Sequence, residues 1–156
     1  MMTARQAEIM ALLRQSLEDH FGETELADQE DATFLRLTPA LFTDGTGLVY
    51  MEICLLDYTE EVMVAQVYST MLPKPGLDLA ALREKLGEWN LKSLAGAYGI
   101  YEAQGQLYHK QSIALINDAA VDDQVDFLFA GICAVMDEMA RRLPEAIALS
   151  SQEPSE

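Results

Sequence analysis

The chain has 156 residues, half of them apolar, and it carries 26 acidic against 10 basic residues, a formal net charge of −16. The length suits one domain with a substantial core. The charge excludes nucleic acid and anionic membrane surfaces as expected partners, because both are negative. Two interpretations of the acidity stay open: solubility alone, or recognition of a basic or amphipathic protein partner.

Cys54 and Cys133 are the two cysteines, and they lie in separate apolar segments. The N-terminal residues lack the basic start, apolar centre and small-residue cleavage site of a secretory signal. No apolar run approaches the length of about 18 residues that a membrane span needs. We therefore expect a cytoplasmic protein in which both thiols are reduced and buried.

A helix is predicted over residues 3–21. Thr3 and Gln6 have the spacing of a capping box, and Gly22 is a suitable terminator. The expected buried stripe is Ile9, Met10, Leu13, Leu17 and Phe21.

An acidic segment follows between residues 18 and 31, and no Lys or Arg lies between Arg14 and Arg36. The spacing of its acids does not match the ligand pattern of a calcium loop. We interpret it as a solvated helix end and loop. A docking face or a weak cation site is the alternative.

Three strands are then predicted at 32–38, 48–56 and 62–71, joined by turns at 44–47 and 57–61. Short strands with short turns favour an antiparallel meander. The central strand should place Val49, Met51, Ile53 and Leu55 on one face.

The other face of these strands is only partly polar. It carries Tyr50, Cys54 and Leu56 on one strand and Tyr68 on the next. A sheet with one face in water alternates more sharply than this. Either a partner chain covers the second face, or the pattern is ordinary scatter.

After the Pro-rich connector at 72–76, Leu79, Leu82, Leu86 and Trp89 repeat at helical spacing. Asp78 can cap this helix, and Trp89 is expected to anchor the core or an interface. Residues 97–103 and 107–116 predict a hairpin whose turn is Gln104-Gly105.

The last segment has the strongest helical pattern. Its apolar stripe is Val121, Val125, Leu128, Ile132, Val135, Met139 and Leu143. Acids at 118, 122 and 123 and the basic pair Arg141 and Arg142 should complement the two ends of the helix dipole. Pro144 should stop or kink the helix.

The element order predicts an α+β domain, α-β-β-β-α-β-β-α, with helices packed on an antiparallel sheet. We assign residues 1–149 to this single domain and 150–156 to a flexible acidic tail.

No residue pattern of a known catalytic or cofactor site is recognised, so no catalytic residue, metal ligand or cofactor is predicted. His20 and His109 lack Cys or His neighbours at ligand spacing, and His109 is expected on the surface of its strand. The adjacent acids Glu60-Glu61 and Asp122-Asp123 should diverge and act as solubilising groups. The eight methionines are expected mainly as core filler, with an adaptable peptide-binding surface as the alternative.

Residues 79–143 carry a family resemblance. They contain L-x-x-L-x-x-x-L-x-x-W-N-L, then G-A-Y-G-I-Y-E-A-Q-G-Q-L-Y, and then the long amphipathic helix. With its element order, the chain resembles the type III secretion chaperone-like fold and, within it, the YbjN family. The resemblance implies a non-enzymatic, cytoplasmic homodimer whose apolar groove holds an extended segment of a partner protein.

We therefore predict a chaperone-like or regulatory protein-binding protein. The alternatives are a small metal-assisted enzyme that uses acidic residues, and a structural subunit of a larger complex. The candidate partner-binding or dimer surface consists of Tyr50, Cys54, Leu56, Tyr68 and Trp89.

Overall fold

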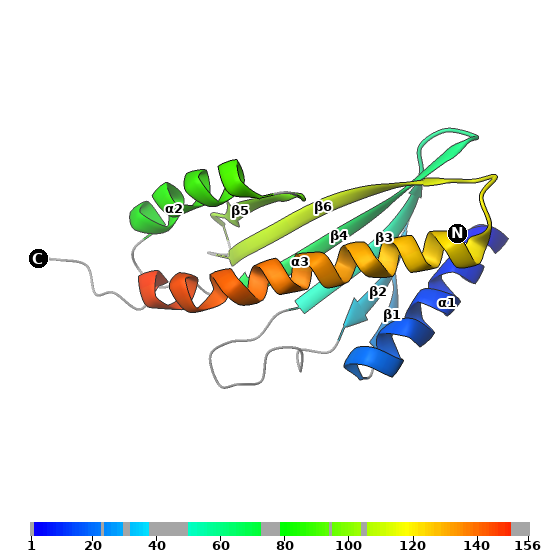
Figure 1. Cartoon of the computed structure of the whole chain (residues 1–156), viewed down its shortest axis with the longest axis horizontal. Helices are drawn as coiled ribbons and strands as arrows, with labels where there is room; N and C mark the ends of the chain where they lie inside the picture. The colour runs from blue at the N-terminus through cyan, green and yellow to red at the C-terminus, as the bar shows by residue number, and fades with distance from the viewer. Residues whose placement is uncertain are drawn as a thin grey trace, which may run out of the picture.

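Three helices and six strands make up the described part of the chain (Figure 1). The computed structural model describes residues 2–22, 24–29, 32–37, 50–72, 79–93, 95–103 and 106–150. The elements are α1 (Ala4–Phe21), β1 (Thr24–Gln29), β2 (Ala32–Leu37), β3 (Tyr50–Asp57), β4 (Val62–Leu72), α2 (Leu79–Lys92), β5 (Ala97–Tyr101), β6 (Gln106–Ile116) and α3 (Val121–Ser150).

The strands form one antiparallel sheet in the order β1-β2-β3-β4-β6-β5, so β1 and β5 are its edges. Helix α3 crosses one face of the sheet in Figure 1, with α1 and α2 beside it. The predicted α+β class, with helices packed on an antiparallel sheet, is confirmed. The predicted turns at 44–47 and 104–105 and the Asp78 cap lie outside the described residues. Of the predicted connector (72–76) and tail (150–156), only Leu72 and Ser150 are described, and they belong to β4 and α3 instead.

Strand β1 is the one element that the sequence pattern missed. Its residues were interpreted as acidic loop, yet all six pair with β2, for example Leu26 with Leu35. The segment TELADQ is too polar to show a period of two clearly, and its place at the sheet edge explains why it is polar. The prediction that residues 24–29 form a loop was wrong.

Helix α1 begins and ends where the sequence indicated. Thr3 caps it: Gln6 N donates to Thr3 Oγ1 at 3.1 Å, and Thr3 N donates to Gln6 Oε1 at 2.9 Å. Gly22 ends it with φ of 102°, a left-handed conformation that glycine adopts without strain.

Strands β3, β4 and β6 alternate between a buried face and a half-buried face. Alternate residues, such as Ile53, Val67 and Leu107, are completely buried under the helices. The side chains of Met51, Met63, Met71, Met136 and Met139 are all buried, which confirms their interpretation as core filler.

Helix α2 packs over the hairpin of β5 and β6 through Trp89, which is 1% exposed. The Trp89 ring meets the Tyr98 ring edge-on at 5.4 Å between centroids, and the Arg142 guanidinium of α3 lies 6.0 Å from the Trp89 ring. Trp89 therefore joins α2, β5 and α3.

Helix α3 buries the predicted stripe, with Val121 only partly covered. It does not stop at Pro144 but continues to Ser150. Two features support the last turns: Ala146 is buried in the core, and Lys85 of α2 forms an ion pair with Glu145 at 3.0 Å. Arg141 and Arg142 consequently do not lie in the last turn, so the predicted dipole complement at that end was wrong.

Arg5 links the start of α1 to the connection between β6 and α3. Its guanidinium donates hydrogen bonds to the carbonyl oxygens of Ala119 at 2.7 Å and Ile116 at 3.2 Å, in the connection between β6 and α3. The start of α1 is thereby fixed to the start of α3, alongside which α1 packs.

Candidate functional site

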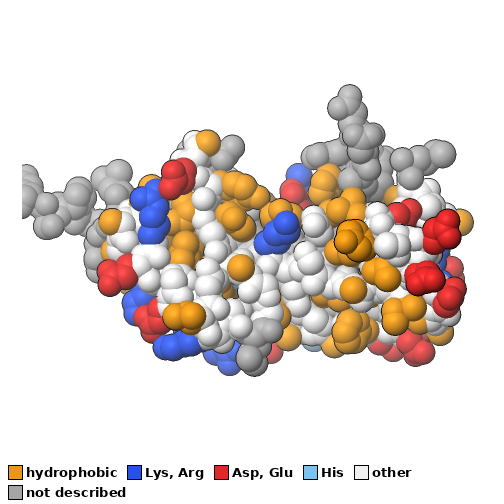
Figure 2. Space-filling model, turned by 90° about the horizontal axis from the view of Figure 1, so that it is seen from above, with side chains coloured by type: hydrophobic (Ala, Val, Ile, Leu, Met, Phe, Trp, Pro, Cys, Tyr) orange, Lys and Arg blue, Asp and Glu red, His pale blue; other side chains and the backbone are white. Residues whose placement is uncertain are grey.

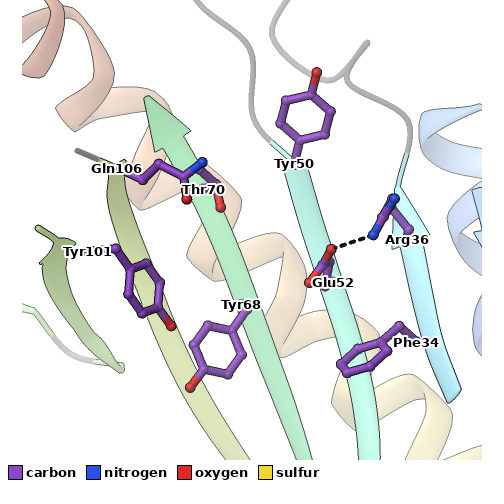
Figure 3. A pocket seen from close by; sticks show the side chains of 8 residues that line it. All are labelled: Phe34, Arg36, Tyr50, Glu52, Tyr68, Thr70, Tyr101 and Gln106. Atoms are coloured by element: carbon purple, nitrogen blue, oxygen red, sulfur yellow. Dashed lines mark hydrogen bonds and ion pairs between the residues drawn. The ribbon is translucent and has the colours of Figure 1, made fainter. Parts of the chain in front are cut away.

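The face of the sheet that points away from the helices is the candidate site. In Figure 3 the strands lie in front of the helices, and the labelled side chains stand on this near face. No helix of the described part of the chain covers it. We call it the open face. Its half-buried residues include Phe34, Arg36, Tyr50, Glu52, Val64, Gln66, Tyr68, Thr70, Tyr108 and Lys110.

A groove of about 440 Å³ lies on the open face. It is lined by Phe34, Arg36, Tyr50, Glu52, Tyr68, Thr70, Tyr101 and Gln106. These residues come from β2, β3, β4, β6 and β5, so the groove runs across the strands (Figure 3). Four inter-strand spacings of about 4.8 Å give it a length of roughly 19 Å.

Tyrosines form one end of the groove. The rings of Tyr101 and Tyr108 lie 4.3 Å apart between centroids, and Tyr108 lies 6.4 Å from Tyr68. The Tyr108 ring passes directly over Gly99, where an added Cβ would come within 2.4 Å of it. Glycine at 99 therefore allows the ring to lie flat against strand β5 and to support Tyr101.

The Tyr101 hydroxyl remains protonated at neutral pH, because burial raises its pKa and the neighbouring Tyr68 raises it further. A protonated tyrosine hydroxyl can both donate and accept a hydrogen bond. The tyrosine end thus presents apolar ring surface together with neutral polar groups.

The charged groups on the groove floor are balanced. Arg36 donates to Glu52 at 2.9 Å, and both side chains are about two-fifths exposed (Figure 3). The Lys110 ammonium lies 5.2 Å from the centre of the Tyr68 ring, a cation–π contact. At this part of the open face two cationic side chains, Arg36 and Lys110, thus lie near one carboxylate, Glu52.

Four of the five residues predicted for the binding surface share the open face. Tyr50 and Tyr68 line the groove, and Leu56, 37% exposed, lies beyond it on β3. Cys54 is on the same face but only 5% exposed, and burial raises the pKa of its thiol. Cys133, on α3, is half-buried, and burial raises its thiol pKa as well.

Trp89 does not belong to this surface. As part of α2 it is buried against the opposite side of the sheet, so its inclusion with the other four was wrong. Its helical spacing with Leu82 and Leu86 identified the buried face of α2, and that signal favoured the core.

Sequence reasoning missed the other groove residues: Phe34, Arg36, Glu52, Thr70, Tyr101 and Gln106. Alternation along each strand does place them on the correct face. The order of the strands was the missing information, because β6 lies between β4 and β5 and brings Tyr101 toward Tyr68.

His109 was expected on the surface and is instead completely buried on the helix side of β6. Its ring stacks edge-on with Tyr98 at 4.7 Å. Its Nε2 lies 3.0 Å from the carbonyl oxygen of Ala95, which can only accept, so Nε2 carries the proton. This histidine fixes the link between α2 and β5.

Acidic side chains gather at the right-hand end of the molecule in Figure 2, the end that holds the β3–β4 turn and the start of α3 in Figure 1. The pairs Glu60-Glu61 and Asp122-Asp123 are exposed there. Among the residues that the structure describes, no group of three or more His, Cys, Asp or Glu is placed to hold a metal ion.

None of the helices in the described ranges combines the length and the apolar character that crossing a bilayer requires. Comparison with known proteins found no family model that matches the sequence and no curated protein that resembles it significantly.

Proposed function

We propose that this is a non-enzymatic protein-binding protein, chaperone-like or regulatory, that works as a homodimer and holds an extended segment of a partner protein on the open face. The observation that carries the proposal is the tyrosine-lined groove that crosses the sheet. The likeness of the sequence to the YbjN family and to secretion chaperones remains a prediction that agrees with it.

The shape of the groove suits a chain segment. At about 3.3 Å per residue, a length of roughly 19 Å holds about six extended residues. Tyrosine is enriched at protein interfaces because its rigid ring gives apolar contact and its hydroxyl gives a hydrogen bond. The Arg36–Glu52 pair offers one donor group and one acceptor group to the backbone or side chains of such a segment.

Binding can be tested with matched tyrosine variants. Tyr68→Asp places a charge on the groove floor, whereas Tyr58→Asp changes a tyrosine that is 77% exposed in the β3–β4 turn. Immobilised wild-type protein and the Tyr58→Asp variant should retain the same partner from native lysate, and Tyr68→Asp should lose it. Equal retention by both variants would refute the groove as the binding site.

The contact itself can be located by crosslinking. A photoreactive phenylalanine analogue in place of Tyr101, which is 42% exposed at the groove, should crosslink to one short segment of the retained partner. The same analogue at position 58 should not. Crosslinks scattered over many partner segments would contradict a defined groove complex.

Homodimer formation is measured separately, by light scattering after size exclusion. Wild-type protein should have twice the mass of the chain. If Leu56→Asp lowers the mass to that of a monomer, the open face also contributes to the dimer. A monomeric wild type would remove the homodimer from the proposal but leave the groove test standing.

The alternative function, a metal-assisted enzyme, requires binding of a divalent cation. Thermal unfolding with millimolar Mg²⁺, Mn²⁺ or Ca²⁺ measures such binding. A ligand that binds only the folded state raises the unfolding temperature by mass action. We expect no rise. A clear rise with one of these ions would favour the metal-assisted enzyme instead.

A further inference from the structure

A smaller cavity, of about 210 Å³, lies on the helix side of the molecule, between the end of α2 and α3. Lys and Arg side chains gather at this end, the left-hand end of Figure 2, and half of the chain's 10 basic residues belong to α2 and α3. We call it the α2–α3 cavity. It is lined by Lys92, Ala95, Ala134, Glu138, Arg141 and Arg142.

The two arginines of this cavity have no carboxylate partner. The three basic residues of α2 all form ion pairs, whereas Arg141 and Arg142 form none with the described residues. Glu138 stands four residues before Arg142, the spacing of a helical ion pair. Its carboxylate instead accepts a hydrogen bond from Ser93 Oγ at 3.3 Å. Two guanidinium groups are thus left at the cavity without an ion pair.

Arg142 holds a buried donor that lacks an acceptor. Its Nε is buried and has no hydrogen-bond partner in the described structure. The guanidinium lies over the Trp89 ring, 6.0 Å from the centroid. A guanidinium carries its N–H donors in its own plane, so contact of its face with a ring leaves its edge able to bind an oxyanion. Because a buried charged donor without an acceptor is unfavourable, an anion bound here would be stabilising.

The hydroxyl of Tyr98 is a second buried group without a partner. Tyr98 is 5% exposed, and its ring contacts those of Trp89 and His109 edge-on. The hydroxyl lies near two lining residues of the cavity, because its pKa, raised mainly by burial, is also raised by Glu138 and lowered by Arg142. It therefore keeps its proton at neutral pH and can donate a hydrogen bond toward the cavity.

We propose that the α2–α3 cavity binds the phosphate group of a small molecule, either inorganic phosphate or a phosphomonoester, through Arg141, Arg142 and the Tyr98 hydroxyl. Three lining side chains are positive and one is negative. Glu88 balances part of the charge of Lys92, so the lining remains positive. The donors come from β5 and α3. They suit the several oxygens of a phosphate better than the two oxygens of a carboxylate.

The net charge of −16 limits which phosphate compound can bind. The acidic surface repels anions from a distance, but salt screens this repulsion beyond about 8 Å at physiological ionic strength. Pairing with the arginines acts at contact and is screened less. A nucleic acid or another polyanion would also lie against acidic surface outside the cavity. The cavity therefore favours a small phosphate compound, and this proposal is independent of the groove on the open face.

Equilibrium dialysis with radiolabelled inorganic phosphate tests the site. Wild-type protein should bind one phosphate per chain, and Arg142→Gln should bind at least about tenfold more weakly, because charge-assisted hydrogen bonds are lost. Arg83→Gln removes the same charge from α2 outside the cavity and should bind like the wild type. Should Arg142→Gln fail to fold, Arg141→Gln changes an exposed residue, and weaker binding is again expected.

Tyr98→Phe separates binding from folding. It removes only a buried hydroxyl without a partner, so the unfolding temperature without phosphate should stay the same or rise. Added phosphate at constant ionic strength should raise the unfolding temperature of the wild type by mass action, and that of Tyr98→Phe by less. No binding by the wild type at about 10 mM phosphate, or equal binding by the wild type and the arginine variants, would overturn the proposal. An equal temperature rise in Tyr98→Phe would contradict a site that includes this hydroxyl.

Competition against the radiolabel identifies the ligand class. Displacement by glycerol 3-phosphate at lower concentration than by unlabelled phosphate would support a phosphomonoester, and the reverse order would support the free ion. Acetate, a carboxylate, should not displace the label. Displacement by acetate as effective as that by phosphate would overturn the assignment of a phosphate site.

Discussion

Ser69 and His109 are paired directly across strands β4 and β6, both fully buried, and neither Ser69 Oγ nor His109 Nδ1 has a hydrogen-bond partner in the described structure. Since His109 Nε2 carries the proton that Ala95 O accepts, Nδ1 is an acceptor in the neutral ring. Burial lowers the pKa of His109, although Ala95 O and Glu138 act in the opposite direction.

This pair predicts a loss of stability in mild acid. The pKa of His109 is lower in the folded state than its unfolded value of about 6.5, so below that pH the unfolded chain binds a proton that the folded chain does not. The free energy of unfolding should fall as the pH drops from 7.5 to 5. Glu138 of α3 acts on His109 in the direction that favours the charged ring, but burial has the larger effect.

His109→Gln should reduce that pH dependence, measured by denaturant unfolding at both pH values. Exposed His20, changed to Gln, is the matched control and should leave the dependence as it is. The ion pairs of Glu88 do not affect the comparison, because Lys92 and Lys85 lower the pKa of Glu88 to about 2, far below this range. Identical pH profiles for wild type and His109→Gln would contradict the prediction.

Ser69→Ala should not destabilise the fold and should raise its free energy of unfolding by about 1 kcal/mol, since it removes a buried hydroxyl that has no partner. Urea unfolding measures the change. Ser112→Ala, on the exposed side of β6, should stay within about 0.5 kcal/mol of wild type. A marked loss of stability in Ser69→Ala would mean that an internal water binds the hydroxyl.

Gly99→Ala should displace the Tyr108 ring, because the new Cβ would lie 2.4 Å from it. Tyr101 would lose its supporting contact at the groove, so partner retention should fall together with stability. Gly87→Ala is the control: its Cβ meets nothing within 4 Å, and alanine in the interior of α2 should stabilise by about 0.5–1 kcal/mol. Full partner retention by Gly99→Ala would show that partner binding does not depend on the position of the Tyr108 ring.

Trp89→Ala should lower the free energy of unfolding by about 3–5 kcal/mol, because it empties the junction of α2, β5 and α3. Trp89→Phe keeps an aromatic ring there and should lose less. Both are measured by thermal and urea unfolding. Folded Trp89→Phe should bind the partner normally, because Trp89 is buried away from the open face.

Periodicity predicted the elements that bury long apolar stripes. Helices α1 and α3 and the alternation of β3, β4 and β6 follow from residues such as Leu13, Ile53 and Ile132, because burial imposes the spacing. The polar segment TELADQ of strand β1 shows no clear period of two, and its pairing with β2 depends on the whole sheet.

Polar residues in buried positions were the hardest to predict. His109 follows the inward alternation of Leu107 and Leu115, yet its residue type suggested the surface. The Ala95 carbonyl that accepts the hydrogen bond from His109 lies 14 residues earlier, beyond β5 and the hairpin turn, where no local pattern indicates it. Pro144 was misjudged for a related reason, because the packing of Ala146 compensates for a hydrogen bond that proline cannot make. The groove needed the strand order, which no local pattern contains.

The Arg5 contact has a consequence for the order of folding. Its two acceptors lie 111 and 114 residues later in the chain. During synthesis, α1 emerges first, but the carbonyl groups that fix its start, and the helix that it packs against, emerge only after more than a hundred further residues. On the ribosome, the buried face of α1 therefore stays uncovered by α3 until every strand of the sheet has been made.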